Sequence, residues 1–241
     1  MAITKDAGTS SNEYTSASSK TFSHTTGADL VNSIIVVVVT SRDASATDGT
    51  VTDVTYNGNA LTLAIAKTYT KPGGDTLRSE IWYRLAPDAG AHNVVVTHTG
   101  TVTRGIAYAV TFSGVSQGNT VNCTATFQKT ESAPGGGADI TVNVVPTFGG
   151  TCVIDIFYDT GDYATTTCDQ TILFNTGMNT NGDGAGSSYE IIADSGAHTI
   201  TWTKTDKSGM CSLAACCLLP YSLPAINISQ SECIGALGHL S

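Results

Sequence analysis

The segment Ser33–Arg42, SIIVVVVTSR, sets the fold class because it is rich in β-branched residues and apolar on both faces. Such a run is typical of a central strand that is covered on both sides. A hairpin signal follows it, in which Asn57 and Gly58 separate Val51–Tyr56 from Ala60–Ala66. An Asn-Gly pair supplies the two positive φ angles of a type I′ turn. The sequence therefore predicts an antiparallel β-sheet protein.

Strand-like segments separated by turn residues continue along the chain at intervals of roughly 8–15 residues. No stretch shows the 3.6-residue apolar period of an amphipathic helix. We therefore predict an all-β fold, an antiparallel, jelly-roll-like β-sandwich with N- and C-terminal extensions. The further expected strands are residues 78–85, 92–98, 104–115, 121–128, 139–145, 151–158, 187–192, 198–204 and 210–219.

The chain divides into three parts by composition. Residues 1–20 are polar and rich in Ser and Thr, and we interpret them as an N-terminal arm, either extended or a short edge strand. Residues 21–221 are expected to form one sandwich domain. Residues 222–241 form a C-terminal tail that is apolar enough to need a surface. The tail is expected to dock on a neighbouring subunit or to fold back over an open face.

Composition and charge exclude several classes of partner. Charged residues are 13% of the chain and the formal net charge is −9. An acidic chain is repelled by phosphate backbones and by anionic lipid, so we expect neither nucleic acid nor a membrane as a partner. Residues 1–20 lack the apolar core of a signal peptide, which favours synthesis in a host cytoplasm.

The odd number of cysteines leaves at least one without a partner in its own chain. Most are expected to be small buried apolar residues, and the alternative is disulfide bonding that includes a neighbouring chain. The candidates for an intermolecular disulfide are Cys233, Cys123 and Cys168. The seven cysteines are Cys123, Cys152, Cys168, Cys211, Cys216, Cys217 and Cys233.

A cluster of carboxylates is a candidate for a cation site. Asp155, Asp159 and Asp162 surround an expected turn, and oxygen ligands of this kind suit Ca²⁺. Asp183, in a Gly/Asn-rich segment, offers a second weak possibility. The complete calcium-loop pattern is absent, so solvated turn carboxylates are the default interpretation. No other cofactor is expected, and the histidines show no metal-binding spacing.

Two further site hypotheses concern carbohydrate. An aromatic-flanked pair, Glu80 and Glu190, would be the candidate for glycoside hydrolysis, which needs two carboxyl groups at a fixed gap. Flat aromatic rings could instead form a glycan-binding face, although packing in the core is the simpler interpretation. The candidates for that face are Tyr56, Trp82, Tyr83 and Trp202.

Several segments resemble a known β-sandwich module. They are SKTFSHTTGADLVNSIIVVVVT (19–40), VTDVTYNGNALTLAIAKTYT (51–70), SEIWYRLAPDAGAHNVVVTHTG (79–100), IAYAVTFSGVSQ (106–117) and AGSSYEIIADSGAHTITWTKTDKSGMCSLAACCLLP (185–220). The module occurs in structural proteins of tailed bacteriophages and in bacterial surface proteins. The resemblance implies a jelly-roll-like sandwich, and no catalytic residue lies among its motifs.

The expected function follows from this resemblance together with the two terminal extensions. We expect a virion structural protein of a tailed bacteriophage, a capsid-decorating or tail-associated subunit that acts by assembly and is not an enzyme. Its partners would be copies of itself, as a homo-oligomer, and other virion proteins such as a capsid or tail protein. The alternative is a carbohydrate-binding or adhesion module, with an extracellular location as the alternative to the virion.

Overall fold

A computed structural model of the chain describes residues 1–28, 30–44, 49–71, 74–129, 139–161, 167–178, 182–203 and 209–222. Every regular element in these ranges is a β-strand, which confirms the predicted all-β antiparallel fold. The strands are β1 (Thr4–Ser10), β2 (Tyr14–Thr26), β3 (Ile34–Asp43), β4 (Val51–Tyr56), β5 (Asn59–Ala60), β6 (Thr62–Thr70), β7 (Thr76–Leu85), β8 (Gly90–Ser113), β9 (Val121–Lys129), β10 (Ile140–Val144), β11 (Thr151–Asp159), β12 (Thr167–Cys168), β13 (Thr171–Gly177), β14 (Gly184–Ile192), β15 (His198–Thr203) and β16 (Cys211–Leu218).

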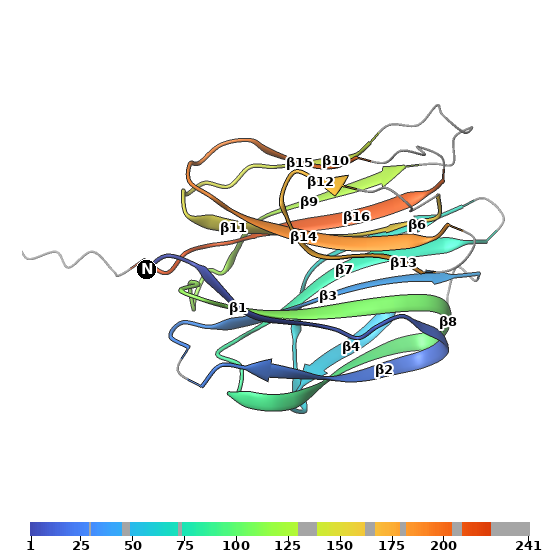
Figure 1. Ribbon diagram of the computed structural model, residues 1–241, viewed down its shortest axis with the longest axis horizontal. Helices are drawn as coiled ribbons and strands as arrows, with labels where there is room; N and C mark the ends of the chain where they lie inside the picture. The colour runs from blue at the N-terminus through green and yellow to red at the C-terminus, as the bar shows by residue number, and fades with distance from the viewer. Residues whose placement is uncertain are drawn as a thin grey trace, which may run out of the picture.

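The first eight strands form one two-layered unit, which we call the first unit. Its larger layer has the strand order β6-β7-β3-β8-β1, and its smaller layer contains β4, β8 and β2. The long strand β8 belongs to both layers. Residues 90–98 pair with β2 and β4, whereas residues 104–113 pair with β3 and β1. The bend of β8 therefore folds one continuous sheet over its own core (Figure 1).

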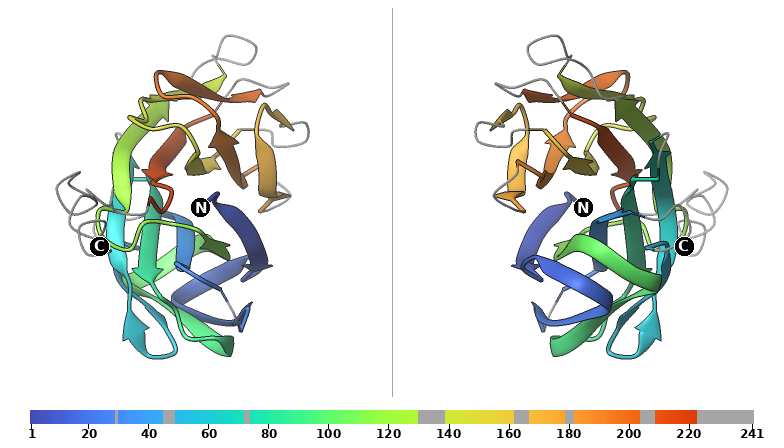
Figure 2. Two further views of the ribbon diagram at one scale, coloured as in Figure 1. Left: turned by 90° about the vertical axis from the view of Figure 1, so that its left-hand side faces the viewer. Right: turned by 90° about the vertical axis from the view of Figure 1, so that its right-hand side faces the viewer.

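Strands β9 to β16 form the second unit, and its layers repeat those of the first. The five-stranded sheet has the order β13-β14-β11-β16-β9, and the three-stranded sheet has the order β10-β15-β12. Strands β15 and β16 take the places of the two halves of β8. Figure 2 shows the two units stacked, with the first unit below the second.

The pairing registers show that the second unit is a structural repeat of the first. Ile34 lies opposite Leu85 and Phe112, and Cys152 lies opposite Ile191 and Leu218 in the same manner. The edge strands β6 and β13 each carry a register shift at the corresponding place. Strand pairing thus groups residues 4–218 into two units of two layers each, and the first unit includes β1 and the beginning of β2.

Three apolar clusters form layers in the molecule, one inside each unit and one between the two units. Alternate residues of β3 face opposite sides: Ile35, Val37 and Val39 pack inside the first unit, whereas Val36 and its neighbours on that face pack against the second unit. Residues of β11 behave in the same way, with Ile154 in the layer between the units. Both central strands are therefore buried on both faces, which the SIIVVVVTSR run predicts for β3.

The first twenty residues are part of the sheet. They form β1 and the beginning of β2, which both pair with β8, and this arrangement corresponds to the edge-strand alternative for the N-terminal arm. The amino group of Met1 donates a hydrogen bond to the carbonyl oxygen of Tyr221 at 3.0 Å. The beginning of β1 and the end of the second unit therefore lie at the same end of the molecule.

Candidate functional site

Asp155 lies in the core of the second unit, where it is fully buried. One carboxylate oxygen accepts a hydrogen bond from the backbone N–H of Ser188 at 2.6 Å. The other accepts hydrogen bonds from the Ser188 hydroxyl at 2.9 Å and from Trp202 Nε1 at 2.8 Å. Burial raises the pKa of Asp155 to about 7, although these hydrogen bonds oppose the shift. The group joins the two sheets of its unit, and its oxygens are directed at protein donors.

The predicted calcium cluster is not assembled from the described residues. Asp159 is buried four positions along β11 from Asp155, a separation of about 13 Å along a strand. Its carboxylate accepts a hydrogen bond from the N–H of Gly161 at 2.5 Å. Asp162, the third predicted ligand, lies outside the described residues. Within the described ranges, no group of three or more His, Cys, Asp or Glu side chains could hold a metal ion.

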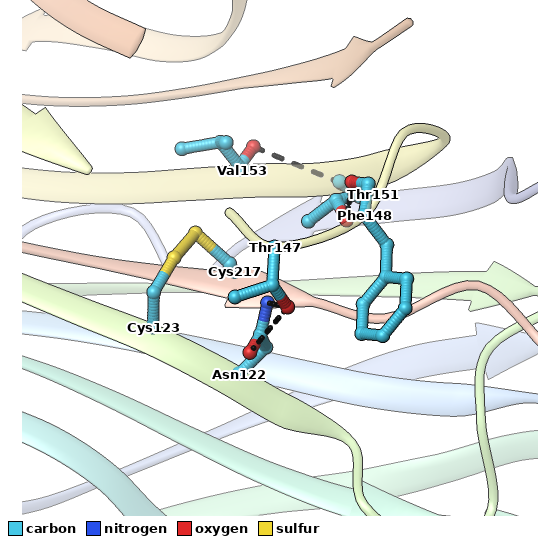
Figure 3. Close-up of a disulfide and its surroundings, with 8 residues drawn as sticks. Asn122, Cys123, Thr147, Phe148, Thr151, Val153 and Cys217 are labelled. Carbon is cyan, nitrogen blue, oxygen red and sulfur yellow. Dashed lines mark hydrogen bonds between the residues drawn. A yellow bond between two sulfur atoms is a disulfide. The ribbon is translucent and has the colours of Figure 1, made fainter. Parts of the chain in front are cut away.

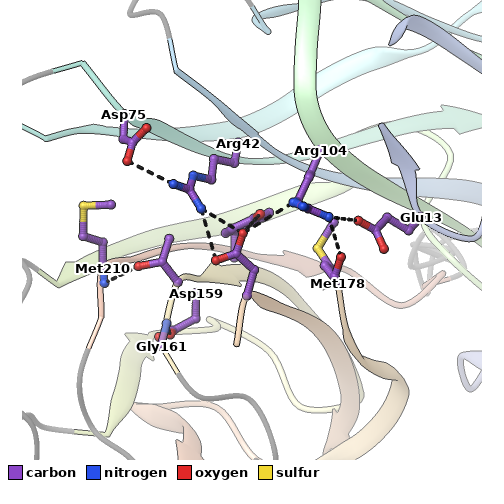
Figure 4. Close-up of polar contacts among 11 residues, drawn as sticks. Glu13, Arg42, Asp75, Arg104, Asp159, Gly161, Met178 and Met210 are labelled. Atoms are coloured by element: carbon purple, nitrogen blue, oxygen red, sulfur yellow. Dashed lines mark hydrogen bonds and ion pairs between the residues drawn. The ribbon is translucent and has the colours of Figure 1, made fainter. Parts of the chain in front are cut away.

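Asp183 takes part in an ion-pair network between the two units. Its carboxylate accepts hydrogen bonds from Arg42 Nη1 at 2.9 and 3.2 Å and from the Tyr158 hydroxyl at 3.0 Å, and Arg104 Nε lies 3.8 Å away. Arg42 also pairs with Asp75 at 3.1 Å (Figure 4). The side chain of Asp183 is almost completely buried, so these partners satisfy a charge that is shielded from water. The network joins the units, which corrects the idea of Asp183 as a calcium ligand.

The core of the first unit also holds a buried carboxyl group against an indole. Glu80 accepts a hydrogen bond from Trp82 Nε1 at 2.9 Å, and burial raises the pKa of Glu80 to about 7. Glu190, its proposed partner in hydrolysis, is on β14 of the other unit and pairs with His198 at 2.9 Å. The structure therefore does not bring Glu80 and Glu190 together as a carboxyl pair.

A second buried polar group in the first unit centres on His98. The Tyr14 hydroxyl lies 2.9 Å from His98 Nε2, and His98 Nδ1 lies 3.0 Å from the carbonyl oxygen of Gly49. Since a carbonyl can only accept, Nδ1 carries the proton and Nε2 accepts from Tyr14. Burial lowers the pKa of His98, which favours this neutral form. Sequence patterns gave no signal for this group, because its members are far apart in the chain.

The four aromatic residues predicted for a glycan face do not form one. Tyr56 and Trp202 are fully buried, in different units, and Trp82 is buried in the first unit. Tyr83 is partly buried against the layer between the units. The three buried rings cannot stack on a sugar, so the predicted face of four rings is not formed and these three rings are corrected to core packing.

The cysteines in the described ranges are mainly core residues, as expected, and two of them form a disulfide. Cys123 on β9 and Cys217 on β16 lie opposite each other and form a disulfide within the chain (Figure 3). Cys123 is therefore not a candidate for an intermolecular bond. Cys168 is a half-buried free thiol whose pKa is raised to about 12 by burial, and a protonated thiol exchanges poorly with disulfides. Cys233 lies outside the described residues.

The described residues form several open grooves, of which two bear on the binding of a ligand. One, of about 430 Å³, lies on the small layer of the first unit, where Thr55, Asn57, His92 and Asn93 supply polar side chains. The other, of about 440 Å³, lies at the end of the molecule that carries the N-terminus. It is lined by Ser116, Asn119, Phe148, Gly149, Leu219, Pro220 and Ser222.

Comparison with known proteins returned no family model, no curated protein and no solved structure that matches this chain. Within the described ranges, no helix is long and apolar enough to cross a membrane. The site residues are therefore interpreted from their own geometry.

Proposed function

We propose that this chain is a structural subunit of a tailed bacteriophage virion, which decorates the capsid or belongs to the tail, and that it acts by assembly. The observation that carries the proposal is the packing of two structural repeats through corresponding faces. Val36 and Ile154 occupy corresponding positions on β3 and β11 and both lie in the layer between the units. A module that already packs on its own repeat is suited to an array of many identical copies.

The way in which the units are joined also supports a structural role. The layer between the units combines a continuous apolar cluster with the ion-pair network of Asp183. Breaking this contact would expose apolar surface and leave a buried charge without its partners at the same time. The segments quoted for the resemblance to phage structural modules lie in both units, which agrees with the same proposal.

The test is the composition of purified particles of a phage that encodes the chain. Quantitative mass spectrometry is expected to find a fixed number of copies per capsid or per tail, and electron microscopy to place them on a symmetric lattice. The proposal is wrong if washed, infectious particles lack the chain. It is also wrong if the copy number varies freely between preparations, as for a carried-over contaminant.

A second candidate function, binding of carbohydrate, is favoured by the polar groove on the first unit. Hydroxyl, amide and imidazole groups around the opening suit the hydroxyls of a sugar. A glycan array with the purified chain tests this candidate. The exposed Asn93 is the residue to change: Asn93→Ala should abolish binding, whereas the exposed Asn143→Ala in the second unit should retain it. Absence of any bound glycan would exclude the candidate.

A further inference from the structure

The groove at the N-terminal end of the molecule has walls that the backbone fixes. Leu219 accepts a hydrogen bond from the N–H of Ser116, and its own N–H donates to Thr120. Pro220 forms an isolated bridge with Val115. The carbonyl oxygen of Phe148 accepts a hydrogen bond from the hydroxyl of Thr151 (Figure 3). The groove is therefore preformed, and a ligand would bind it without first ordering its walls.

Apolar side chains are exposed around this groove. Phe148, which lines it, is 59% exposed, and Val145 in the same loop is also 59% exposed. Met1, which contacts Tyr221, is 64% exposed. None of the described residues that line the groove is charged. Apolar surface of this kind, gathered at one end of a molecule, is typical of a site that another segment covers.

The chain itself continues from the rim of the groove. Ser222 lines the groove, and residues 223–241 follow it with Glu232 as their one acidic or basic residue apart from His239. The apolar members of this segment include Ile226, Ile228, Ile234, Leu237 and Leu240. A segment with few charges and several large apolar side chains matches an uncharged groove whose apolar walls are Phe148, Leu219 and Pro220. Its attachment at the rim gives it an effective concentration in the millimolar range, which a separate molecule would have to exceed.

We propose that residues 224–241 of the chain bind the groove lined by Phe148, Leu219 and Pro220 in the same molecule. The bound segment would cover exposed apolar surface at this end and would limit the contacts that the end makes with other molecules. This inference rests on the groove and on the composition of the segment. It is independent of the proposed virion function.

The test is a cross-link in the full-length chain. Phe148→Cys places a thiol at the groove, and Cys233 supplies one in the segment. Under mild oxidation at low protein concentration, a disulfide between the introduced thiol and Cys233 within one chain is expected. Mass spectrometry of peptides and a non-reducing gel detect it. The matched control is Ile172→Cys, which alters a comparably exposed apolar residue on β13 and should yield no bond to Cys233. Adding Cys233→Ser to Phe148→Cys should abolish the product.

Two results of the cross-link would overturn the proposal. A disulfide between chains would assign the groove to a second copy, and a yield no higher than that of Ile172→Cys would show that the segment lies elsewhere. Hydrogen exchange gives an independent readout, which does not depend on the position of one thiol. Removing residues 223–241 should speed exchange in residues 147–150 and leave β13 unchanged. Equal exchange in both forms would also overturn the proposal.

Discussion

The two units share one strand order but stabilise corresponding places in their cores by different chemistry. In the first unit, the buried His24 lies between the hydroxyls of Thr9, at 3.0 Å, and Thr111, at 2.8 Å. By strand register, the corresponding residues of the second unit are Ala125, Val144 and Cys217. There, apolar contacts and the disulfide to Cys123 replace the hydrogen bonds. The comparison teaches that pairing order defines this fold and that several kinds of core contact can satisfy it.

A second comparison concerns the buried carboxyl groups. Each unit holds one carboxylate against an indole N–H, but the groups come from positions that do not correspond: Glu80 and Trp82 from β7, and Asp155 and Trp202 from β11 and β15. Burial raises the pKa of both carboxyl groups to about 7. The two units therefore form similar polar contacts with residues at positions that do not correspond.

The largest expected effect comes from removing the disulfide that the second unit alone has. Cys123→Ala with Cys217→Ala should lower the free energy of unfolding by about 4 kcal/mol, because the bond closes a long loop of the unfolded chain. Urea denaturation without reductant measures the change. Cys168→Ala, which removes a half-buried free thiol, is the control and should cost about 1 kcal/mol or less. A double variant as stable as the parent would contradict the role of the bond.

The next effect concerns the contact between the units. Asp183→Ala removes the carboxylate that Arg42 and Arg104 share. The substitution should lower the free energy of unfolding by about 2–3 kcal/mol. The cost stays below that of a fully buried pair because each arginine is about a quarter exposed and keeps a second carboxylate. Urea denaturation measures it, with the exposed Asp194→Ala as control, which should change stability by less than about 0.5 kcal/mol. Equal effects of the two variants would show that the network contributes nothing to stability.

The pH dependence of stability sharpens the comparison of the two carboxyl groups. The pKa of Asp155 is about 7 in the folded chain and 3.8 as its ordinary value. Between these values the folded state keeps a proton that the unfolded state releases, so the contribution of Asp155 to stability is largest below about pH 4 and falls as the pH rises to 7. Over this range the free energy of unfolding of the parent should fall by on the order of 2 kcal/mol relative to that of Asp155→Asn.

Denaturation at a series of pH values, with both proteins in the same buffers, measures this difference. Glu80→Gln is the companion variant in the first unit. The stability of the parent relative to this variant should also fall as the pH rises. Parallel curves for the parent and Asp155→Asn would contradict a raised pKa of Asp155 in the folded state.

The smallest effects are expected on the exposed edge strands. Leu63 on β6 and Ile172 on β13 lie at corresponding register shifts and are 43% and 42% exposed. Leu63→Thr and Ile172→Thr should each change the free energy of unfolding by less than about 0.5 kcal/mol. Thermal unfolding checks both. A clear loss for only one of them would show that the two edges are not in corresponding environments.

Much of the local structure could be predicted from the sequence. The turn at Asn57 and Gly58 has positive φ angles at both residues, of 50° and 73°, so the predicted type I′ hairpin is confirmed. The repeat also has a signal in the sequence, which is visible only when two distant segments are compared with each other. Residues 88–92 read DAGAH and residues 194–198 read DSGAH, and the glycine of each has a positive φ angle. Insertions between strands change the spacing elsewhere, which hides the remaining correspondence.

The candidate sites were predicted less well, because they depend on which strands become neighbours. Asp155 and Asp159 are close enough in sequence to suggest a cation site with Asp162, yet Asp155 accepts a hydrogen bond from an indole and Asp159 from the N–H of a turn residue. Asp183, the separate second candidate, instead pairs with arginine. Residues Cys123 and Cys217 are 94 positions apart, and only the pairing of β9 with β16 brings them together.

The sequence by itself determined that this chain forms antiparallel strands with a doubly buried central strand, because alternation and turn chemistry act between residues that are close in the chain. The tertiary structure alone decided that there are two units, that corresponding faces pack together, and that Asp155 meets Trp202 across the two sheets of its unit. These features depend on contacts between distant segments, and residue spacing along a chain carries little information about distances across a sheet.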